Sequence, residues 1–464
     1  MAPSVSASAT TAVMWFRRDL RLSDHPALSS ALSEFDRVVP LFVWDPALLG
    51  PCGPPRLAFL SGCVSELDRS LDGRLVVRHG RPAEVVPEVA ARCGARAVFI
   101  TGDFGPYGSS RDDEVAARLD GDGVALRVAD SPYAVPPGVL ETGSGTPFQV
   151  FTPFSKAWRS HGWAEPARRH RLDRIDSAGL GSEGAPEIPG LEADLPEPGE
   201  EAAHRQLDRF LRSGADGYGT ERDRPDLDST SRLSAYLRFG CLHPRQILAR
   251  LDRHKPSHRT YESELCWREF YADVLYHRPD AARRSYRPEW RSFQVDGGAR
   301  ADERFEAWAR GRTGYPIVDA GMRQLLGEGF MHNRVRMIVA SFLVKDLHVD
   351  WTRGARWFMR HLVDGDLASN QLNWQWVAGS GTDAAPFFRV FNPVSQGRKF
   401  DPDGDYVRRW VPELAHLGPA HIHEPWKADR SLFDAGSSGY PDPIVDHGAE
   451  REEALARYHR LRRS

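Results

Sequence analysis

Short apolar runs alternate with segments of helical periodicity over the first 130 residues. The runs are AVMWF (12–16), RVVPLFVW (37–44), RLVVRHG (74–80), RAVFIT (96–101) and VALRVAD (124–130), and stretches such as PPRLAFLSGCVSELDRSL (54–71) separate them. Strands that alternate with helices in this way form a parallel, doubly wound sheet. The pattern therefore predicts a Rossmann-like α/β domain over residues 10–140.

The first predicted strand leads into FRRDLRLSDHPAL (16–28). We expect Ser23 or Asp24 to cap a helix that carries Pro26 in its first turn. No G-x-G-x-x-G follows this strand, so a dinucleotide bound in the usual Rossmann manner is not expected in this domain.

Between about 160 and 203 the composition shifts to Gly, Pro, Glu and Ser, as in SAGLGSEGAPEIPGLEADLPEPGEE (177–201). We assign residues 141–203 to a linker. Beyond it strand signals vanish, and helical periodicity marks HRQLDRFLRSG (204–214), PRQILARLDRH (244–254), VDAGMRQLLGEGF (318–330) and NRVRMIVASFLVKDL (333–347). Residues 204–464 are predicted to form an all-helical domain.

Length and composition agree with a multidomain protein of the cytoplasm. The 464 residues exceed what one core usually serves, and 41% of them are hydrophobic. Five cysteines without a C-x-x-C argue against a disulfide framework and fit a reducing compartment. No signal peptide or membrane-length apolar run is seen, and the first ten residues are expected to be disordered. A net charge of −3 excludes a uniformly basic coat but permits a local basic face.

The stretch DGDLASNQLNWQW (364–376) concentrates acids, amides and indoles. In a helix, the i, i+4, i+8 spacing places Asp366, Asn370 and Trp374 on one face, where they would line a wall of a site. The alternative is that Asp364 or Asp366 caps a helix and the tryptophans fill the core.

Two further segments carry polar groups that suit ligands. Thr230, Ser231 and Ser234 gather hydroxyls at a predicted helix start, a setting that suits phosphate, with an ordinary N-cap as the alternative. In YESELCWREFY (261–271), one helical face holds Glu264 beside Trp267. A carboxylate can hydrogen-bond a base edge while an indole stacks on a flat ligand; the alternative is a solvent-exposed Glu–Arg pair beside a core tryptophan.

The segment GYPIVDAGMRQLLGEGFMHNRVRMIVASF (314–342) places an amide, a cation and a thioether on one helical face, from Asn333, Arg336 and Met337. A largely buried Arg336 needs a carboxylate partner, which Asp364 or Asp366 would supply.

The segment RVFNPVSQGRKFD (389–401) is predicted to be a cationic loop. It contains Arg389, Asn392, Gln396, Arg398 and Lys399, and together with Arg222 and Arg334 it could contact phosphates. The alternative is a solvated loop. No metal site is expected, because the histidines at 332, 348 and 361 lack ligand spacing. No G-x-S-x-G or P-loop motif occurs.

These segments, in this order after an α/β domain that begins MWFRRDLRLSDHPAL, resemble the DNA photolyase and cryptochrome family over nearly the whole chain. The most specific motifs are TGYPIVDAGMRQL, MHNRVRMI, DGDLASNQLNWQW and FNPVSQGRKFD. Within the family the chain looks most like class I enzymes that repair cyclobutane pyrimidine dimers, especially the deazaflavin-using branch. The resemblance implies FAD in the helical domain and a monomer that acts on a flipped-out dimer in UV-damaged DNA.

The resemblance also implies residue roles. FAD would be held by Tyr218, Thr230, Ser231, Arg232, Leu233, Ser234, Tyr261, Arg268, Asn333, Arg336, Asp364, Gly365, Asp366 and Asn370, where Tyr261 replaces a tryptophan common in relatives. The dimer and its strand would meet Arg222, Glu264, Trp267, Arg334, Met337, Trp376, Gln396 and Lys399. Glu264 would also assist protonation of the dimer. Asp45, Arg56 and Asp103 would bind an antenna, 8-hydroxy-5-deazaflavin or methenyltetrahydrofolate.

Relatives reduce their flavin by electron hopping along three tryptophans, and the inner two match Trp374 and Trp351. The outer one is missing, since its place falls on Val295 or Gly298. Trp290 or Trp357 would have to replace it. The rival functions are a cryptochrome-like photoreceptor that does not repair DNA, and repair of 6-4 photoproducts, which would require a histidine-bearing site.

Overall fold

One five-stranded parallel sheet forms the core of the N-terminal domain. The computed structural model describes residues 9–167, 172–188, 190–382, 388–428 and 439–463, so the first eight residues of the segment expected to be disordered lie outside it. The strands are β1 (Thr11–Phe16), β2 (Arg37–Trp44), β3 (Val76–His79), β4 (Ala95–Ile100) and β5 (Ala125–Val128), in the order β3-β2-β1-β4-β5. Val13 of β1 pairs with Val39 and with Val98. The predicted doubly wound sheet is confirmed.

Helices cover both faces of this sheet. Successive side chains of β1 point to opposite faces, so both faces carry apolar side chains that need to be covered. Ala12, Met14 and Phe16 pack in one apolar cluster with α1 (Pro26–Glu34) and α3 (Pro54–Ser70). Val13 and Trp15 pack in another with α4 (Pro82–Cys93), while α5 (Pro106–Gly121) adds its own side chains there and α2 (Pro46–Leu49) follows β2.

The predicted cap of α1 is wrong. His25 is the N-cap, and its Nδ1 accepts a hydrogen bond from the amide of Leu28 at 3.2 Å. The two expected caps bind elsewhere, since the amide of Ser23 donates to Glu200 at 2.9 Å and Asp24 pairs with Arg245 at 3.1 Å. Tertiary contacts with the helical domain therefore override the local capping preference.

The range assigned to a linker contains a helix, α6 (Phe151–His161). Its Trp158 is fully buried and donates from Nε1 to Oε2 of Glu269 at 2.6 Å. Polar composition nearby hid this helix, whose apolar residues pack on the helical domain. Among the described residues from 162 to 199 there is no helix or strand, although Ile175 forms an isolated parallel bridge with Val38 of β2.

The second domain is helical throughout its described residues, as predicted. Its helices are α7 (Glu200–Ser213), α8 (Tyr218–Glu221), α9 (Ser234–Phe239), α10 (Pro244–Leu248), α11 (Pro256–His277), α12 (Ala299–Ala309), α13 (Pro316–Glu328), α14 (Asn333–Ser341), α15 (Trp351–His361), α16 (Leu367–Ala378), α17 (Pro393–Phe400), α18 (Asp405–Trp410) and α20 (His447–Leu461). Short turns are η1 (Pro279–Ala282), η2 (Pro288–Ser292), η4 (Pro412–Leu414) and η5 (Pro425–Lys427), and η3 (Phe342–Asp346) is a π-helical turn.

Two local predictions differ from this structure. The helix expected over 333–347 ends at Ser341 and continues as the π turn η3. The segment expected as a cationic loop is the helix α17, which begins because Asn392 accepts from the amide of Ser395 at 2.9 Å and Pro393 occupies its first turn.

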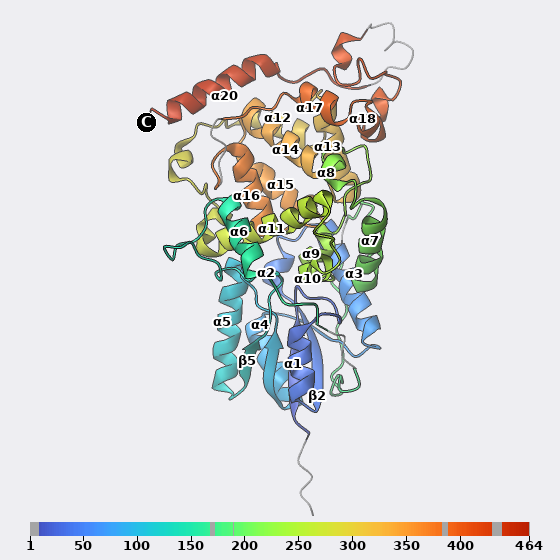
Figure 1. Ribbon diagram of the computed structural model, residues 1–464, viewed down its shortest axis with the longest axis vertical. Helices are drawn as coiled ribbons and strands as arrows, with labels where there is room; N and C mark the ends of the chain where they lie inside the picture. Colours follow the sequence, from blue (N-terminus) through green and yellow to red (C-terminus); the bar gives the residue numbers. More distant parts are fainter. Residues whose placement is uncertain (1–8, 168–171, 189, 383–387, 429–438, 464) are drawn as a thin grey trace, which may run out of the picture.

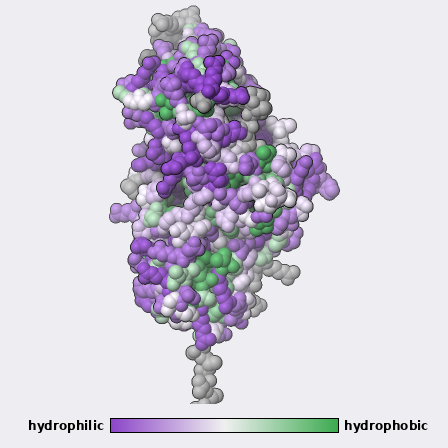
Figure 2. Space-filling model, turned by 90° about the vertical axis from the view of Figure 1, so that its left-hand side faces the viewer, coloured by the Kyte–Doolittle hydropathy of each residue, from purple (hydrophilic) through white to green (hydrophobic). Residues whose placement is uncertain are grey.

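The helical domain stacks on one end of the α/β domain, and α20 crosses the end farthest from the sheet (Figure 1). Figure 2 shows a face that is mostly hydrophilic, with smaller apolar patches. Among the described residues, no helix is long and apolar enough to cross a membrane.

Candidate active site

Helix α16 brings together the three residues of the predicted polar wall. Asp366 is its N-cap and accepts from the amide of Ser369 at 3.0 Å. Asn370 and Trp374 follow at one-turn intervals and are 8% and 3% exposed. The capping interpretation is therefore confirmed for Asp366, and Trp374 lies in the core. The three side chains share one face of the helix, and the role of that face as a wall of a site stays a prediction.

The predicted pair between Arg336 and Asp364 forms. Nη2 of Arg336 lies 2.9 Å from Oδ2 of Asp364, whose side chain is 4% exposed. Oδ1 of the same carboxylate is buried and has no hydrogen-bond partner among the described residues. Because a buried, unpaired carboxylate oxygen is costly, this atom fits a donor supplied by a ligand.

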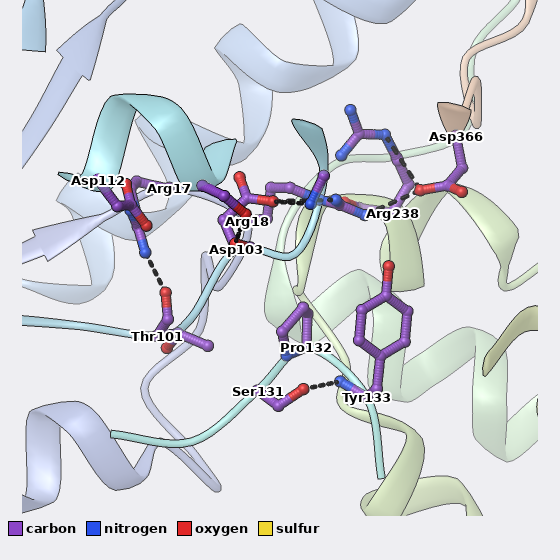
Figure 3. A network of polar contacts seen from close by, with 12 residues as sticks. Arg17, Arg18, Thr101, Asp103, Asp112, Ser131, Pro132, Tyr133, Arg238 and Asp366 are labelled. Carbon is purple, nitrogen blue, oxygen red and sulfur yellow. Dashed lines mark hydrogen bonds and ion pairs between the residues drawn. The ribbon is translucent and has the colours of Figure 1, made fainter. Parts of the chain in front are cut away.

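Of the two acids offered as partners, Asp364 therefore pairs with Arg336, and Asp366 pairs with other arginines. It lies 2.9 Å from Nη2 of Arg18, in the α/β domain, and 4.0 Å from Nε of Arg238 (Figure 3). Burial acts to raise the pKa of Asp366, but the guanidiniums of Arg18 and then Arg238 outweigh it and hold the pKa well below the usual range. The sequence reasoning missed both arginines.

Arg238 has the least favourable electrostatic environment of the two arginines beside Asp366. Burial first, and then the neighbouring charge of Arg18, lower its pKa to about 9. Its Nη1 is buried without a partner among the described residues, although its Nε donates to the carbonyl of Gly365 at 2.9 Å. A second anion or acceptor beside Asp366 would satisfy it.

Two hydrogen bonds that Nδ2 donates fix the orientation of the side-chain amide of Asn370. Nδ2 donates to the carbonyl of Ala355 at 3.1 Å and to Oε1 of Gln371 at 2.8 Å. The amide oxygen is therefore the atom left to accept a hydrogen bond from a ligand.

Trp374 is packed tightly against α15. A Cβ on Gly354 would lie 2.2 Å from its ring, so only glycine fits there. The Trp374 ring centroid is also 6.2 Å from that of Trp308 and 5.0 Å from that of Phe358.

The segment 230–234 contacts Tyr261 through a side-chain hydrogen bond of Ser231. The rings of Tyr218 and Tyr261 are 5.0 Å apart, and the carbonyl of Ser231 accepts from Gln206 at 2.9 Å. Helix α9 has no side-chain N-cap bond, so the hydroxyls of Thr230 and Ser234 are not used for capping. Leu233 is buried, whereas Arg232 turns away to pair with Glu328 at 3.0 Å and to cover the ring of Phe330.

Helix α11 positions the predicted substrate residues. Glu264 accepts from Arg222 at 2.5 Å. Burial raises the pKa of Glu264, and the Arg222 guanidinium offsets only part of that increase. Trp267 stacks on Phe151 of α6, with ring centroids 3.6 Å apart and planes 6° apart, a contact that the sequence did not reveal.

Arg268, one turn further along α11, has its guanidinium held by the protein. It donates to the carbonyls of Pro132 and Leu237 at 3.1 and 3.2 Å and lies over the ring of Tyr133. It acts on Asp366 through charge and not through a direct bond.

Most of the residues predicted to contact the DNA strand lie on or near α14 and α17. Arg334 pairs with Asp223 at 2.9 Å and lies 3.6 Å from Sδ of Met337. Asn333 starts α14, Trp376 and Gln396 are half-buried, and Lys399 is exposed. Arg398, also on α17, is already paired with Glu424.

Two of the three predicted antenna residues lie at the carboxyl end of the sheet. Asp45, after β2, caps α2 and accepts from the hydroxyl of Tyr107 at 2.5 Å. Asp103, after β4, pairs with Arg111 at 3.3 Å. In doubly wound sheets this edge, near the point where strand order reverses between β1 and β4, is the usual ligand crevice.

The third antenna residue, Arg56, is not part of this group. It donates to the carbonyl of Met359 at 2.8 Å and to that of Pro51 at 3.2 Å. Nη1 of Arg56 also closes over Gly365, where an added Cβ would approach it to 2.4 Å. Arg56 thus ties α3 to the helical domain beside the Asp364–Asp366 turn.

The fold and this site define a two-domain protein: a doubly wound domain stacked on a helical domain that contains a buried wall of acid, amide and indole side chains. Residues 12–171 match the family model described as DNA photolyase, and residues 261–460 match the FAD binding domain of DNA photolyase. The chain belongs to the DNA photolyase family.

Similar proteins cover the whole chain. A deoxyribodipyrimidine photo-lyase of Streptomyces griseus is 43% identical over 464 residues, covering 98% of this chain and 99% of that protein. A crystal structure of a bacterial class III photolyase from Agrobacterium tumefaciens superimposes with a TM-score of 0.91 at 37% identity, covering all of both chains. An archaeal photolyase from Sulfolobus tokodaii with two FAD molecules gives 0.84 at 32% identity, covering 97% and 100%.

Proposed function

We propose that this protein is a light-driven lyase that splits cyclobutane pyrimidine dimers in UV-damaged DNA, with FAD in its helical domain. The buried and unpaired Oδ1 of Asp364, two residues before the cap of α16, carries the proposal, because it fits a hydrogen-bond donor supplied by a ligand. Bound FAD, once reduced and excited by light, supplies the electron that opens the dimer.

The chain's own residues orient the flavin ring. Arg336 fixes one oxygen of Asp364. The other oxygen would accept a hydrogen bond from the flavin ring, and the amide oxygen of Asn370, whose Nδ2 is already bonded to Ala355, would face that ring. Gly365 keeps the turn between the two acids narrow, since the guanidinium of Arg56 fills the space that a side chain would need. Asp366 stays ionised beside them.

The rest of FAD would lie along the hydroxyl segment. Thr230, Ser231 and Ser234 offer donors for the phosphates and ribityl chain, and Tyr218 with Tyr261 supplies an aromatic wall. Arg232 takes part through its backbone, because its side chain is paired with Glu328.

A flipped-out dimer would be read by α11 and α14. Base chemistry requires extrusion from the duplex, which costs least where a lesion has weakened stacking. Glu264 is the hydrogen-bond partner of the bases and a proton source, since burial favours its neutral form. Trp267, Trp376 and Met337 pack on the dimer, while Arg222, Arg334, Gln396 and Lys399 meet the strand.

The cofactor placement is tested with Asp364→Asn and the matched pair-breaking variant Arg336→Gln. Both should lose FAD during gel filtration, with an apparent Kd at least about tenfold higher for the amide, because a carboxylate acceptor is replaced by a weaker one. FAD retention equal to wild type in Asp364→Asn would contradict the assignment.

The antenna is proposed to be 8-hydroxy-5-deazaflavin, with methenyltetrahydrofolate as the alternative. Asp45 and Asp103 at the carboxyl edge of the sheet support a ligand there. Protein produced with a deazaflavin-making pathway should gain a near-violet absorption band, and Asp103→Asn should reduce it. No added band with the pathway present would contradict the deazaflavin.

We also propose a monomer that acts in a reducing cytoplasm. All five cysteines are free, including Cys63 and Cys241, whose sulfurs lie 3.5 Å apart without forming a disulfide. Sedimentation at micromolar concentration should give a mass near the 52.0 kDa of one chain.

A further inference from the structure

A cavity of about 320 Å³ lies beside Trp351, between the start of α15 and the turn η2. Trp351 and Trp290 both line it, and each is less than a tenth exposed. Phe293, Phe388, Val295, Val344 and Val349 complete its apolar lining. The walls are therefore suited to a flat aromatic ring.

The polar groups of the cavity favour an anion. Arg283 and Arg284 line it, are exposed, and have no ion-pair partner among the described residues. The lining holds one acid, Asp350, whose Oδ1 already accepts from the amide of Thr352 at 2.7 Å. The buried ammonium of Lys345 adds further positive potential, although burial lowers its pKa to about 7.

Two serines of the cavity lining differ in their hydrogen bonds. The hydroxyl of Ser380, a residue that lines the cavity and is 1% exposed, has no hydrogen-bond partner among the described residues. Ser285, across the cavity lining, accepts from Nε1 of Trp351 at 3.4 Å. The carboxylate of a ligand would be bound by Arg283 and Arg284, while its ring lies near both indoles.

We propose that this cavity binds a planar aromatic anion that acts as the one-electron donor to Trp351. The electron leaves the bound anion, which is oxidised by one electron, and reduces the Trp351 radical cation to neutral indole; no bond forms or breaks in the protein. The radical cation arises when Trp351 has passed an electron to Trp374 during light-driven FAD reduction. The donor role, but not the binding itself, rests on the proposed function and on the electron hopping through Trp374 and Trp351 that the family resemblance implies.

Trp290 gives this site a route to the exterior. Its ring centroid is 5.9 Å from those of Phe388 and Tyr458, and the latter two rings are stacked at 4.8 Å. The occupant and Trp290 together take the place of a third indole outside Trp351.

Binding is measured first, by calorimetry on the FAD-loaded protein in the dark, with indole-3-propionate as probe. It should bind with a Kd below about 1 mM. The neutral probe 3-methylindole should bind about tenfold more weakly or worse, because it cannot engage the arginines. Equal affinity for the two probes, or displacement by equimolar inorganic phosphate, would overturn the aromatic-anion site.

Variants then locate the site. Arg283→Gln with Arg284→Gln should weaken binding of indole-3-propionate about tenfold, while Arg96→Gln, at an exposed arginine of β4, should not change it. Val295→Trp should abolish binding by filling the cavity from its partly exposed edge. Wild-type affinity in Val295→Trp would place the probe elsewhere.

Photoreduction tests the donor role separately. Indole-3-propionate at saturation should accelerate light-driven reduction of oxidised FAD several-fold in wild type and not in the double arginine variant. Binding without acceleration would contradict the donor role. Dimer repair by chemically reduced protein needs no external donor, so its failure would count against the proposed function and not against this site.

Discussion

Nη2 of Arg18 lies 2.9 Å from Oδ2 of Asp366, although the two residues are 348 positions apart in the chain. This bond joins the loop after β1 to the cap of α16, the helix that carries Asn370 and Trp374. The same guanidinium is 3.9 Å from Asp103, at the carboxyl edge of the sheet. Arg18 thus links Asp103, a candidate antenna residue, to Asp366 of the polar wall, as Figure 3 shows.

Replacing Arg18 by Gln should loosen this junction. The pair is partly exposed, and removing Arg18 also relieves its repulsion of Arg238, so we expect a loss of only about 1–2 kcal/mol in the free energy of unfolding. Urea unfolding of the FAD-loaded protein, followed by flavin and far-UV signals, measures it. Arg96→Gln is the control, and unchanged stability in Arg18→Gln would contradict a structural role for the bond.

The bond between Arg18 and Asp366 should also make the free energy of unfolding depend on pH. The folded protein holds the pKa of Asp366 below its unfolded value of about 3.9, so the stabilisation is fully present above that value. It is lost as the pH falls through the folded pKa. The stability difference between wild type and Arg18→Gln should therefore be largest near neutral pH and shrink below about pH 4. A difference that grew in acid would have the wrong sign.

Glu264→Gln should lower the repair yield per absorbed photon about fivefold, which corresponds to one lost hydrogen bond and proton source of about 1 kcal/mol. Because the pKa of Glu264 is raised, the neutral acid is favoured at low pH and lost as the pH rises. Yield in wild type should fall with rising pH, and in Glu264→Gln it should be flat. Comparable pH profiles for the two proteins would remove Glu264 from the protonation step.

Trp374→Phe should block light-driven reduction of oxidised FAD while leaving repair by chemically reduced enzyme intact. Trp351→Phe should strongly slow the light-driven reduction of oxidised FAD. Trp308 also lies close to Trp374, and Phe305 continues from it towards Trp357 at 5.6 and 6.0 Å, so a slow residual rate would report that branch. Absorption during illumination with a thiol donor is the measurement. Rapid, full reduction in Trp351→Phe would exclude its hopping role.

The parts that were predictable from the sequence are those encoded within one element or one motif. The five apolar runs predict the sheet, and helical spacing predicts that Arg336 faces an acid of the 364–366 turn. The bond between Arg18 and Asp366 depends on how two domains dock, which no local pattern contains. His25 rather than Ser23 caps α1 for the same reason, because Glu200 from the second domain takes the serine.

The outer end of the electron path shows the same limit. The sequence reveals the missing third tryptophan, but only the structure shows that Trp290 of η2, Val295 and Trp351 of α15 line one cavity in that region. The stacking of Trp267 on Phe151 is another such contact, since α6 lies in the range 141–203 that the sequence analysis assigns to a linker.

The most direct test of the central claim is to incubate the reduced, FAD-loaded protein with oligonucleotides that carry either a cyclobutane dimer or a 6-4 photoproduct, in blue light and in the dark. We predict restoration of the cyclobutane dimer only, and only in light. No light-dependent restoration of either lesion would contradict the account and favour a photoreceptor, while restoration of the 6-4 photoproduct would contradict the assigned substrate.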